Sequence, residues 1–299
     1  MRNFTFKGLF LAAMFMVLGS LAIQAADDGL IIKQITVKLE KAGTLPDRIG
    51  STKRNKITNL KIIGEINGTD LRVIRYMSNR DTGGKLAILD LSEAKIVRGG
   101  DYYYYDYEEF YTHDNELGTH AFYGCRGLTS LTLPSGLTSI GSWAFTGCSG
   151  LTSLSLPSGV TSIGDGAFFG LSSLTSLSLP SGLTSIGDGT FYGCSGLTSI
   201  YVYAEKMPKL GTNMFGGCDA KKCTVYVPKG TYDDYWLSEF GYFENIVEFE
   251  ATGINNVITS NDAKELSRYS VNGQRLPAPT KGLNIVKYSD GSVKKVAVQ

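Results

Sequence analysis

The chain has 299 residues, a formal net charge of +1 and a charged fraction of 19%. So balanced a composition gives no electrostatic basis for binding nucleic acid or an anionic membrane surface. A chain of this length often holds two domains, but a repeat protein grows by adding units without needing one large core. We therefore expect one long repeat domain followed by a small tail.

Residues 1–26 have the pattern of a secretory signal peptide. The segment begins with Arg2 and Lys7, continues with an apolar core, and ends in small residues before Asp27. No cysteine stands at the expected cleavage site, and no later segment is long enough to span a bilayer. We predict an exported protein, secreted or at the cell surface, that is not a lipoprotein and does not insert into the membrane.

Residues 27–100 contain irregular repeats, and we predict that they cap the amino-terminal end of the repeat domain. Aliphatic residues recur as L-x-x-L-x-L at 57–62 and 86–91, and an earlier strand is expected near Val37. A helix is expected between the two phrases, with Asp70 as its cap. Terminal repeats commonly depart from the consensus in this way.

Residues 101–117 form an insertion that is rich in tyrosine and in acidic residues. Tyrosine gives a large contact area at a low entropic cost and is common at binding hot spots. Two interpretations stay open: a lid that packs on the edge of the repeats, or a site for a partner. The acidic residues lack the ordered spacing of a calcium loop, so no metal site is predicted.

Residues 118–230 repeat one phrase every 23 residues, marked by Phe122, Phe145, Phe168 and Phe191. Each phenylalanine is followed by an L-x-x-L-x-L run, whose aliphatic residues alternate with serine and threonine as in a half-buried strand. A Pro-Ser-Gly turn and a short helical turn are expected to complete each unit. The pattern predicts an α/β leucine-rich repeat solenoid, because one unit alone cannot bury its apolar side.

This phrase resembles the BspA-like leucine-rich repeat proteins of Bacteroides-type bacteria. The resemblance depends on the Ala-Phe-x-Gly-Cys segment at Ala121–Cys125 and on Leu-Pro-Ser-Gly-Leu-Thr-Ser-Ile-Gly at Leu133–Gly141, and it extends from about Ile35 to Glu250. It implies a secreted or surface-exposed binding protein, in a family associated with adhesion to host proteins, without catalytic residues.

The five cysteines are interpreted as packing residues rather than as a disulfide framework. Cys125, Cys148 and Cys194 occupy the same repeat position, where Leu171 stands in the remaining copy. Leucine at an equivalent position indicates burial, which is common for free cysteine. Whether Cys218 and Cys223 pair stays open.

Residues 231–251 are predicted to cap the carboxy-terminal end, with aromatic residues at helical spacing between Tyr232 and Phe243. Residues 252–299 are predicted to form a small β module with turns at Asn272-Gly273 and Asp290-Gly291. This tail weakly resembles the sorting domains of the type IX secretion system, although Asn284 stands where that family has tyrosine.

The sequence contains no H-E-x-x-H, no G-x-S-x-G and no phosphate-binding loop, and its only histidines are His113 and His120. We therefore predict no enzyme activity, no catalytic residue, no cofactor and no metal ion.

The predicted function is binding of a protein on a host or neighbouring cell. We expect two aromatic anchors, one on the insertion and one on the outward positions of the last strands, with small hydroxyl residues between them. The candidate ligand-binding residues are Tyr103, Tyr105, Tyr107, Tyr111, Thr132, Ser155, Ser178, Tyr201 and Tyr226. The alternatives are a carbohydrate-binding accessory protein and a structural surface component. The sequence determines neither the ligand nor the oligomeric state.

Overall fold

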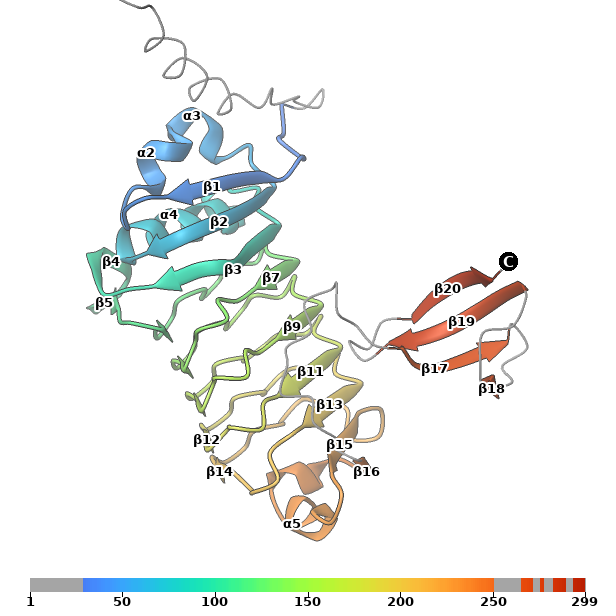
Figure 1. Cartoon of the computed structure of the whole chain (residues 1–299). Helices are drawn as coiled ribbons and strands as arrows, with labels where there is room; N and C mark the ends of the chain where they lie inside the picture. Colours follow the sequence, from blue (N-terminus) through green and yellow to red (C-terminus); the bar gives the residue numbers. More distant parts are fainter. Residues whose placement is uncertain (1–28, 250–264, 271–274, 277–281, 289–292, 299) are drawn as a thin grey trace, which may run out of the picture. The chain divides into compact units, whose positions relative to one another are not determined.

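The computed structural model describes residues 29–249, 265–270, 275–276, 282–288 and 293–298 (Figure 1). The predicted signal peptide and the two predicted turns of the tail lie outside these residues. The chain separates into two compact units, Met1–Ala251 and Thr252–Gln299.

The first unit carries parallel strands on two of its sides. The longer strands form two sheets, which we call the main sheets. The first has the order β1 (Ile35–Leu39), β2 (Asn59–Ile66), β3 (Ile88–Ile96), β7 (Ser130–Thr132). The second has the order β9 (Ser153–Ser155), β11 (Ser176–Leu179), β13 (Ser199–Val202), β15 (Thr224–Pro228), β16 (Asn245–Phe249). The short sheet consists of two-residue strands, in the order β6 (Glu116–Leu117), β8 (Ser139–Ile140), β10 (Ser162–Ile163), β12 (Ser185–Ile186), β14 (Lys209–Leu210). Each 23-residue unit contributes one strand to each side, so equivalent residues such as Ser176 and Ser199 lie in register. This arrangement confirms the predicted leucine-rich repeat solenoid.

The third side of each unit is a wall of hydrogen-bonded turns, where the sequence suggested a helical turn. Within one unit, the Cys125 N–H donates to the Phe122 carbonyl at 3.0 Å. Between units, the Phe122 N–H donates to the Ala144 carbonyl at 2.7 Å, and the Phe145 N–H donates to the Ala167 carbonyl at 2.8 Å. All three sides of the solenoid are therefore joined along its axis by backbone hydrogen bonds.

The core of the regular units is a column of buried phenylalanine rings. Neighbouring rings are nearly parallel: the centroids of Phe145 and Phe168 are 5.4 Å apart at 7°, and those of Phe168 and Phe191 are 5.5 Å apart at 2°. The cysteines of this wall are buried and free, as predicted, and the Cys148 thiol donates to the Phe122 carbonyl. Cys218 and Cys223 are likewise free thiols.

One turn position on this wall has a left-handed backbone in every unit. The residues there are His120, Trp143, Gly166, Gly189 and Asn213, with φ between 53° and 59°. Glycine adopts this conformation without strain, whereas histidine and tryptophan do so at a cost. The repeat geometry therefore imposes the conformation, even where the local residue disfavours it.

Between Gly29 and Gly100, the described residues add three α-helices to the strands: α2 (Leu45–Ile49), α3 (Ser51–Arg54) and α4 (Gly68–Ser78). The prediction that Asp70 is the N-cap of α4 is wrong by three residues, because Asn67 holds that position and Asp70 completes a capping box. The fully buried Asp70 carboxylate accepts from the N–H groups of Asn67 at 3.0 Å, Gly43 at 2.5 Å and Leu45 at 2.9 Å. Asp70 thus joins the starts of α2 and α4.

The carboxy-terminal end of the column is closed by α5 (Tyr232–Trp236) and a 3₁₀ turn, η3 (Glu239–Tyr242). The rings of Phe240 and Phe243 meet Phe215 at 54° and 64°, so they end the parallel stack. Among the aromatic residues at helical spacing that were expected to cap this end, Trp236 is 44% exposed and stacks on Tyr232. The helix is too short to bury a full aromatic stripe.

The second unit contains an antiparallel sheet with the order β18 (Arg275–Leu276), β17 (Glu265–Ser270), β19 (Gly282–Tyr288), β20 (Val293–Val298). Its strands β19 and β20 flank the predicted Asp290-Gly291 turn. In the part of the chain that the structure describes, no helix has the length and apolar character needed to cross a membrane.

Candidate functional site

The tyrosine-rich insertion forms an antiparallel hairpin of β4 (Gly99–Asp106) and β5 (Glu108–Thr112). Asp106 pairs with Glu108, so Tyr107 alone forms the tip. Tyr107 has a φ of 59° and is 97% exposed. Because a bulky residue with positive φ is an outlier, this exposed ring stands in a conformation that glycine or asparagine would adopt more easily.

The inner side of the hairpin packs on the first repeat through an aromatic cluster. Tyr104 contacts Phe110, His120 and Tyr123, with ring centroids 6.1, 5.0 and 5.7 Å apart. The Arg75 guanidinium of α4 lies 4.4 Å from the centre of the Tyr104 ring, a cation–π contact. These contacts fit the lid interpretation of this side of the insertion.

Arg75 and Tyr103 supply hydrogen bonds that a preceding repeat would otherwise provide. In the regular units, the carbonyls of the wall accept from backbone N–H groups of the unit before. The irregular unit before the first regular repeat has helix α4 in place of such a turn, and the Tyr103 hydroxyl donates to the Thr119 carbonyl at 2.6 Å. Arg75 donates to the carbonyls of Ala121 at 2.9 Å and Tyr123 at 3.2 Å. The open backbone edge is therefore closed by side chains.

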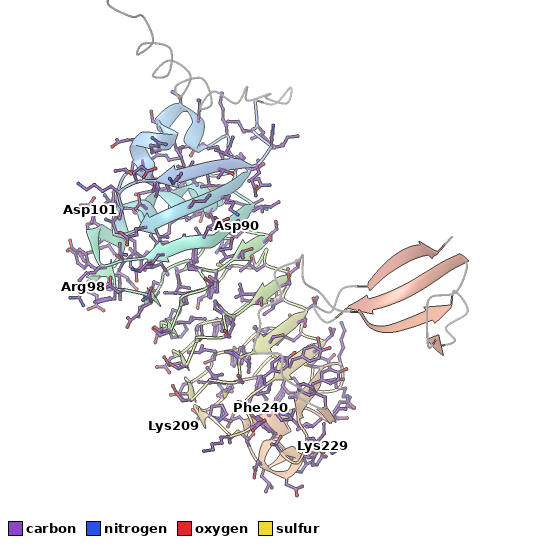
Figure 2. The ribbon with its side chains drawn as sticks, in the orientation of Figure 1. Asp90, Arg98, Asp101, Lys209, Lys229 and Phe240 are labelled. Carbon is purple, nitrogen blue, oxygen red and sulfur yellow. The ribbon has the colours of Figure 1, made fainter. Side chains whose placement is uncertain are left out.

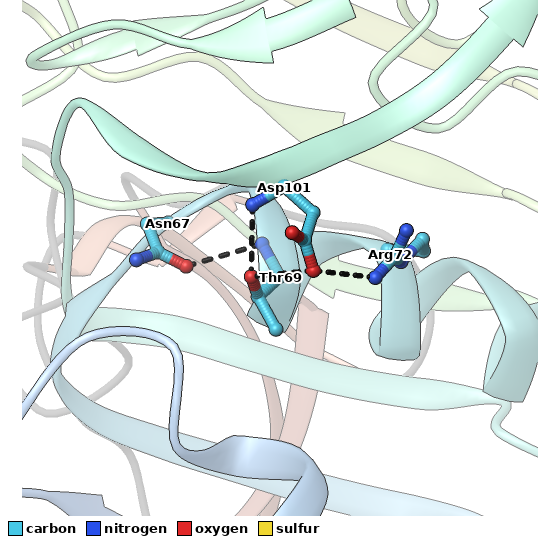
Figure 3. Close-up of polar contacts among 4 residues, drawn as sticks. All are labelled: Asn67, Thr69, Arg72 and Asp101. Atoms are coloured by element: carbon cyan, nitrogen blue, oxygen red, sulfur yellow. Dashed lines mark hydrogen bonds and ion pairs between the residues drawn. The ribbon is translucent and has the colours of Figure 1, made fainter.

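The base of the hairpin is attached to the start of α4, as Figure 3 shows. Arg72 forms an ion pair with Asp101 at 2.6 Å, and the Asp101 N–H donates to the Thr69 hydroxyl at 2.9 Å. The Asn67 side chain accepts from the Thr69 N–H at 3.1 Å, so the cap of α4 belongs to the same network. Together with Arg75, these contacts fix the hairpin on a rigid element.

The structure divides the predicted tyrosines between the two sides of the hairpin. Tyr103 is buried, with 3% of its surface exposed, so a partner cannot reach it. Burial also raises the pKa of its hydroxyl. Tyr105, Tyr107 and Tyr111 are exposed. The Tyr111 hydroxyl donates to the Glu109 carboxylate, and this hydrogen bond raises the pKa of Tyr111.

An open groove of about 650 Å³ lies between the hairpin and the short sheet. One wall is formed by hairpin residues, including Phe110, Tyr111 and Glu108. The floor carries the serine row, which we define as the half-buried residues Ser139, Ser162 and Ser185, in register on β8, β10 and β12. In Figure 1, the hairpin and the strands β12 and β14 lie on the same side of this unit.

The serine row was not predicted from the sequence, although a signal for it was present. Thr-Ser-Ile precedes a glycine at the same point of three repeats, ending at Ile140, Ile163 and Ile186. The isoleucines are buried, so the serines before them point outward from each short strand.

The other predicted site residues lie on the main sheets and do not line the groove. Thr132 and Ser155 are exposed, and Ser178 is half-buried. Tyr201 and Tyr226 stack with centroids 4.6 Å apart at 7°, and burial raises the pKa of Tyr201. The two predicted aromatic anchors therefore occupy different sides of the repeat unit.

The main sheets and the groove also differ in their charged side chains. On the main sheets, Lys61 pairs with Asp90 at 3.4 Å and with Glu93 at 2.6 Å. The groove is lined by Glu108, Glu109 and Glu116 and by no lysine or arginine. In Figure 2, Arg98 and Asp101 lie by the hairpin, whereas Lys209 lies at the other end of the short sheet. The groove is thus an acidic surface.

The described residues hold no group of three or more His, Cys, Asp or Glu side chains that could hold a metal ion. Burial raises the pKa of the Cys125 thiol to about 11 and that of Cys194 to about 12. Such thiols are protonated at neutral pH and are poor nucleophiles. The chemistry available at the surface is therefore hydrogen bonding, aromatic contact and charge.

Similarity to known proteins is found among solved structures of bacterial leucine-rich repeat proteins. No curated protein matches the chain. Among solved structures, a leucine-rich repeat protein of T. pallidum is 22% identical with a TM-score of 0.41, over 65% of this chain and 85% of that one. One from Eubacterium ventriosum is 16% identical with a TM-score of 0.31, over 74% and 81% of the two chains. One from Bacteroides ovatus is 18% identical with a TM-score of 0.25, over 76% and 71%.

The family model of the BspA type leucine rich repeat region matches six copies within residues 115–233. This segment contains the phenylalanine column, the serine row and the wall of turns described above. Residues 115–233 are therefore a BspA-type leucine-rich repeat region.

Proposed function

We propose that this protein is an exported, non-enzymatic binding protein that recognises a protein on a host or neighbouring cell. Leucine-rich repeat regions generally serve as scaffolds for protein interaction. Here the scaffold presents the outer side of the hairpin, with Tyr105, Tyr107 and Tyr111, as the main anchor. Tyr201 and Tyr226 would form a separate, second surface on the main sheets.

The observation that carries this proposal is the tip of the hairpin. Tyr107 exposes nearly its whole side chain while its backbone has a positive φ. Backbone strain of this kind tends to cluster at functional sites, and exposed tyrosine is a frequent hot-spot residue. The fold gains nothing from a fully exposed ring, so we infer that the ring serves the complex.

Export is part of the same proposal and is supported by the pattern of residues 1–26. We propose location outside the cell, secreted or on its surface, without a lipid anchor. Sorting by the type IX system would depend on residues 252–299, whose likeness to such domains is weak. Carbohydrate binding and a purely structural surface role remain the competing functions.

The test uses Tyr107→Gly, because glycine suits the backbone and removes only the ring. The purified chain and its variant are applied to an immobilised panel of extracellular matrix proteins and to a glycan array. We expect a protein of the panel to bind the wild type, and Y107G to weaken that binding by about 2 kcal/mol with an unchanged melting temperature.

Tyr232→Ala is the matched control, since it removes an exposed tyrosine from the carboxy-terminal cap. It should leave the affinity for the same panel protein unchanged. Equal binding by Y107G and the wild type would refute the hairpin as the anchor. Binding to glycans alone would replace the protein partner by the carbohydrate alternative.

A further inference from the structure

The acidic groove beside the hairpin has the features of a site for an extended polypeptide. Its floor runs across successive strands of the short sheet, and glycines stand beside the serine row on the same floor. A Cβ atom at Gly141 would lie 2.4 Å from the Thr119 nitrogen, and one at Gly164 would lie 2.5 Å from the Ser142 nitrogen. The close stacking of the turns thus keeps this strip free of side chains, so a ligand backbone can approach it.

The serine row continues in register at both ends. Glu116 pairs with Ser139 on the hairpin side, and Lys209 pairs with Ser185 on the far side. Strands lie about 4.8 Å apart, so the row from Glu116 to Lys209 spans roughly 19 Å, the length of about six extended residues. Serine hydroxyls both donate and accept hydrogen bonds, and can serve either group of a peptide backbone.

The charges of the groove select a basic segment. Glu108, Glu109 and Glu116 form no ion pair within the described part of the chain. From Gly127 to Ala204 the sequence has no lysine or arginine, so the repeats add no cation to the floor. Lys209 closes the row away from the hairpin. The basic side chains of a ligand therefore belong at the hairpin end.

The aromatic wall suits the same side chains. Tyr111 is exposed, and its hydroxyl is bonded to Glu109, so an aromatic face and a carboxylate stand side by side. The stems of lysine and arginine pack on apolar surface while their charged ends reach a carboxylate. Phe110 extends the apolar part of the wall.

We propose that this groove binds an extended segment of a partner protein that carries lysine or arginine, with its basic side chains between Tyr111 and the three glutamates. The inference rests on the proposed protein-binding function and names the chemistry of the partner. Charge complementarity of this kind gives specificity and faster association, and it weakens with salt.

The test measures binding of fluorescent peptides to the full chain by anisotropy. One peptide alternates lysine with serine, a second replaces each lysine by glutamine, and a third replaces each by glutamate. We expect the lysine peptide to bind at low salt, at least tenfold more tightly than the other two. Equal affinity of the three peptides, or no binding of the lysine peptide, would overturn the inference.

The site is located with the triple variant E108Q/E109Q/E116Q, which removes three charges and keeps the side-chain shapes. It should weaken binding of the lysine peptide about tenfold at an unchanged melting temperature. The control E205Q/D233N/E244Q removes three exposed charges elsewhere in the same unit, and should change the affinity less than twofold. An equal loss in both variants would indicate bulk charge attraction, and would overturn the groove as the site.

Tyr107 does not line the groove, so Y107G should bind the lysine peptide as the wild type does. This variant separates the two proposals. A panel protein that depends on Tyr107, together with a lysine peptide that does not bind, would support the hairpin anchor and reject the basic segment. A lysine peptide held by the glutamates, with no panel protein that depends on Tyr107, would support the groove and reject the anchor.

Discussion

The regular repeats and the region before them satisfy the same backbone groups in different ways. Along the repeats, alternate carbonyls of the turn wall accept from the backbone of the preceding unit, as Ala144 does from Phe122. At the first repeat the equivalent carbonyls accept from Arg75 and from the Tyr103 hydroxyl. The interior therefore depends on a shared geometry that many sequences could adopt, whereas the end depends on two particular side chains.

The regular repeats and the hairpin region also differ in the side chains that they expose. From Gly127 to Ala204 the surface is supplied largely by serine, threonine and glycine, without a basic residue. Hydroxyl groups that stay hydrated give little surplus energy on binding. Aromatic and unpaired acidic side chains gather at the hairpin, where the repeat is interrupted. The contacts that stabilise the fold are thus distributed along the phenylalanine column, whereas the side chains suited to recognition lie at its amino-terminal end.

The largest effect should come from breaking the column at its centre. Phe168→Ala removes a fully buried ring that stacks on Phe145 and Phe191. We expect a loss of about 3–5 kcal/mol in the free energy of unfolding, because a cavity opens between units. Urea denaturation measures it. Ser178→Ala on the main sheet is the control and should change the value by less than about 0.5 kcal/mol.

Removing the Arg75 side chain, which closes the open backbone edge of the first regular repeat, should have the next largest effect on stability. Arg75→Ala leaves the carbonyls of Ala121 and Tyr123 without these donors and removes the cation–π contact with Tyr104. We expect a loss of about 2–4 kcal/mol. Arg72→Ala breaks a partly exposed ion pair with Asp101, which should cost less than about 1 kcal/mol. Similar losses for the two variants would contradict the edge-closing role of Arg75.

The repeats could be predicted because their signal is written several times. The period of 23 residues placed the strands, the phenylalanine column and the buried cysteines. The irregular strands β2 and β3 and the helix between them were also predicted, since their aliphatic patterns remained legible. The cap of α4 was misplaced because Asn67 and Asp70 are both good capping residues, and only the tertiary contacts of Asp70 to Gly43 and Leu45 distinguish their roles.

The orientation of the tyrosines could not be read from the sequence. Strand alternation places Tyr103 and Tyr105 on one side, yet Tyr103 is buried and Tyr105 is 64% exposed. The pairing of β4 with β5 shifts in register between Gly99 and Tyr104, which interrupts the regular alternation of the side chains. The groove was missed for a related reason, since it depends on where the hairpin docks.

Within the insertion, the inner and outer tyrosines should respond differently to loss of the hydroxyl. Tyr103→Phe leaves the part-buried carbonyl of Thr119 without this donor and should cost about 1 kcal/mol. Tyr107→Phe removes a hydroxyl that faces solvent and should leave stability unchanged. Urea denaturation of both variants tests the assignment. A larger loss in Y107F than in Y103F would reverse the two sides of the hairpin.

The smallest expected effect concerns the pH dependence of the docked hairpin. His120 lies among Tyr104, Phe110 and Tyr123, and its buried Nδ1 has no hydrogen-bond partner. Burial lowers the pKa of His120 below 6.5; Arg75 adds to this, while Asp106 and Glu108 oppose it. The folded state therefore resists protonation more than the unfolded state does. Stability from this residue is present above pH 6.5 and is lost as the pH falls from there through the folded pKa.

The variant His120→Asn tests this directly, because asparagine occupies the equivalent left-handed position at Asn213 and does not titrate. Unfolding is measured in urea at intervals from pH 7.5 to pH 5. The wild type should lose more stability over that range than H120N. This difference in pH dependence does not depend on how much the loss of the ring contacts lowers the stability of H120N at pH 7.5. His113 is exposed, so His113→Asn should follow the wild type. If H120N and the wild type decline in parallel, the pH response arises from other groups and His120 is only a packing residue beneath the hairpin.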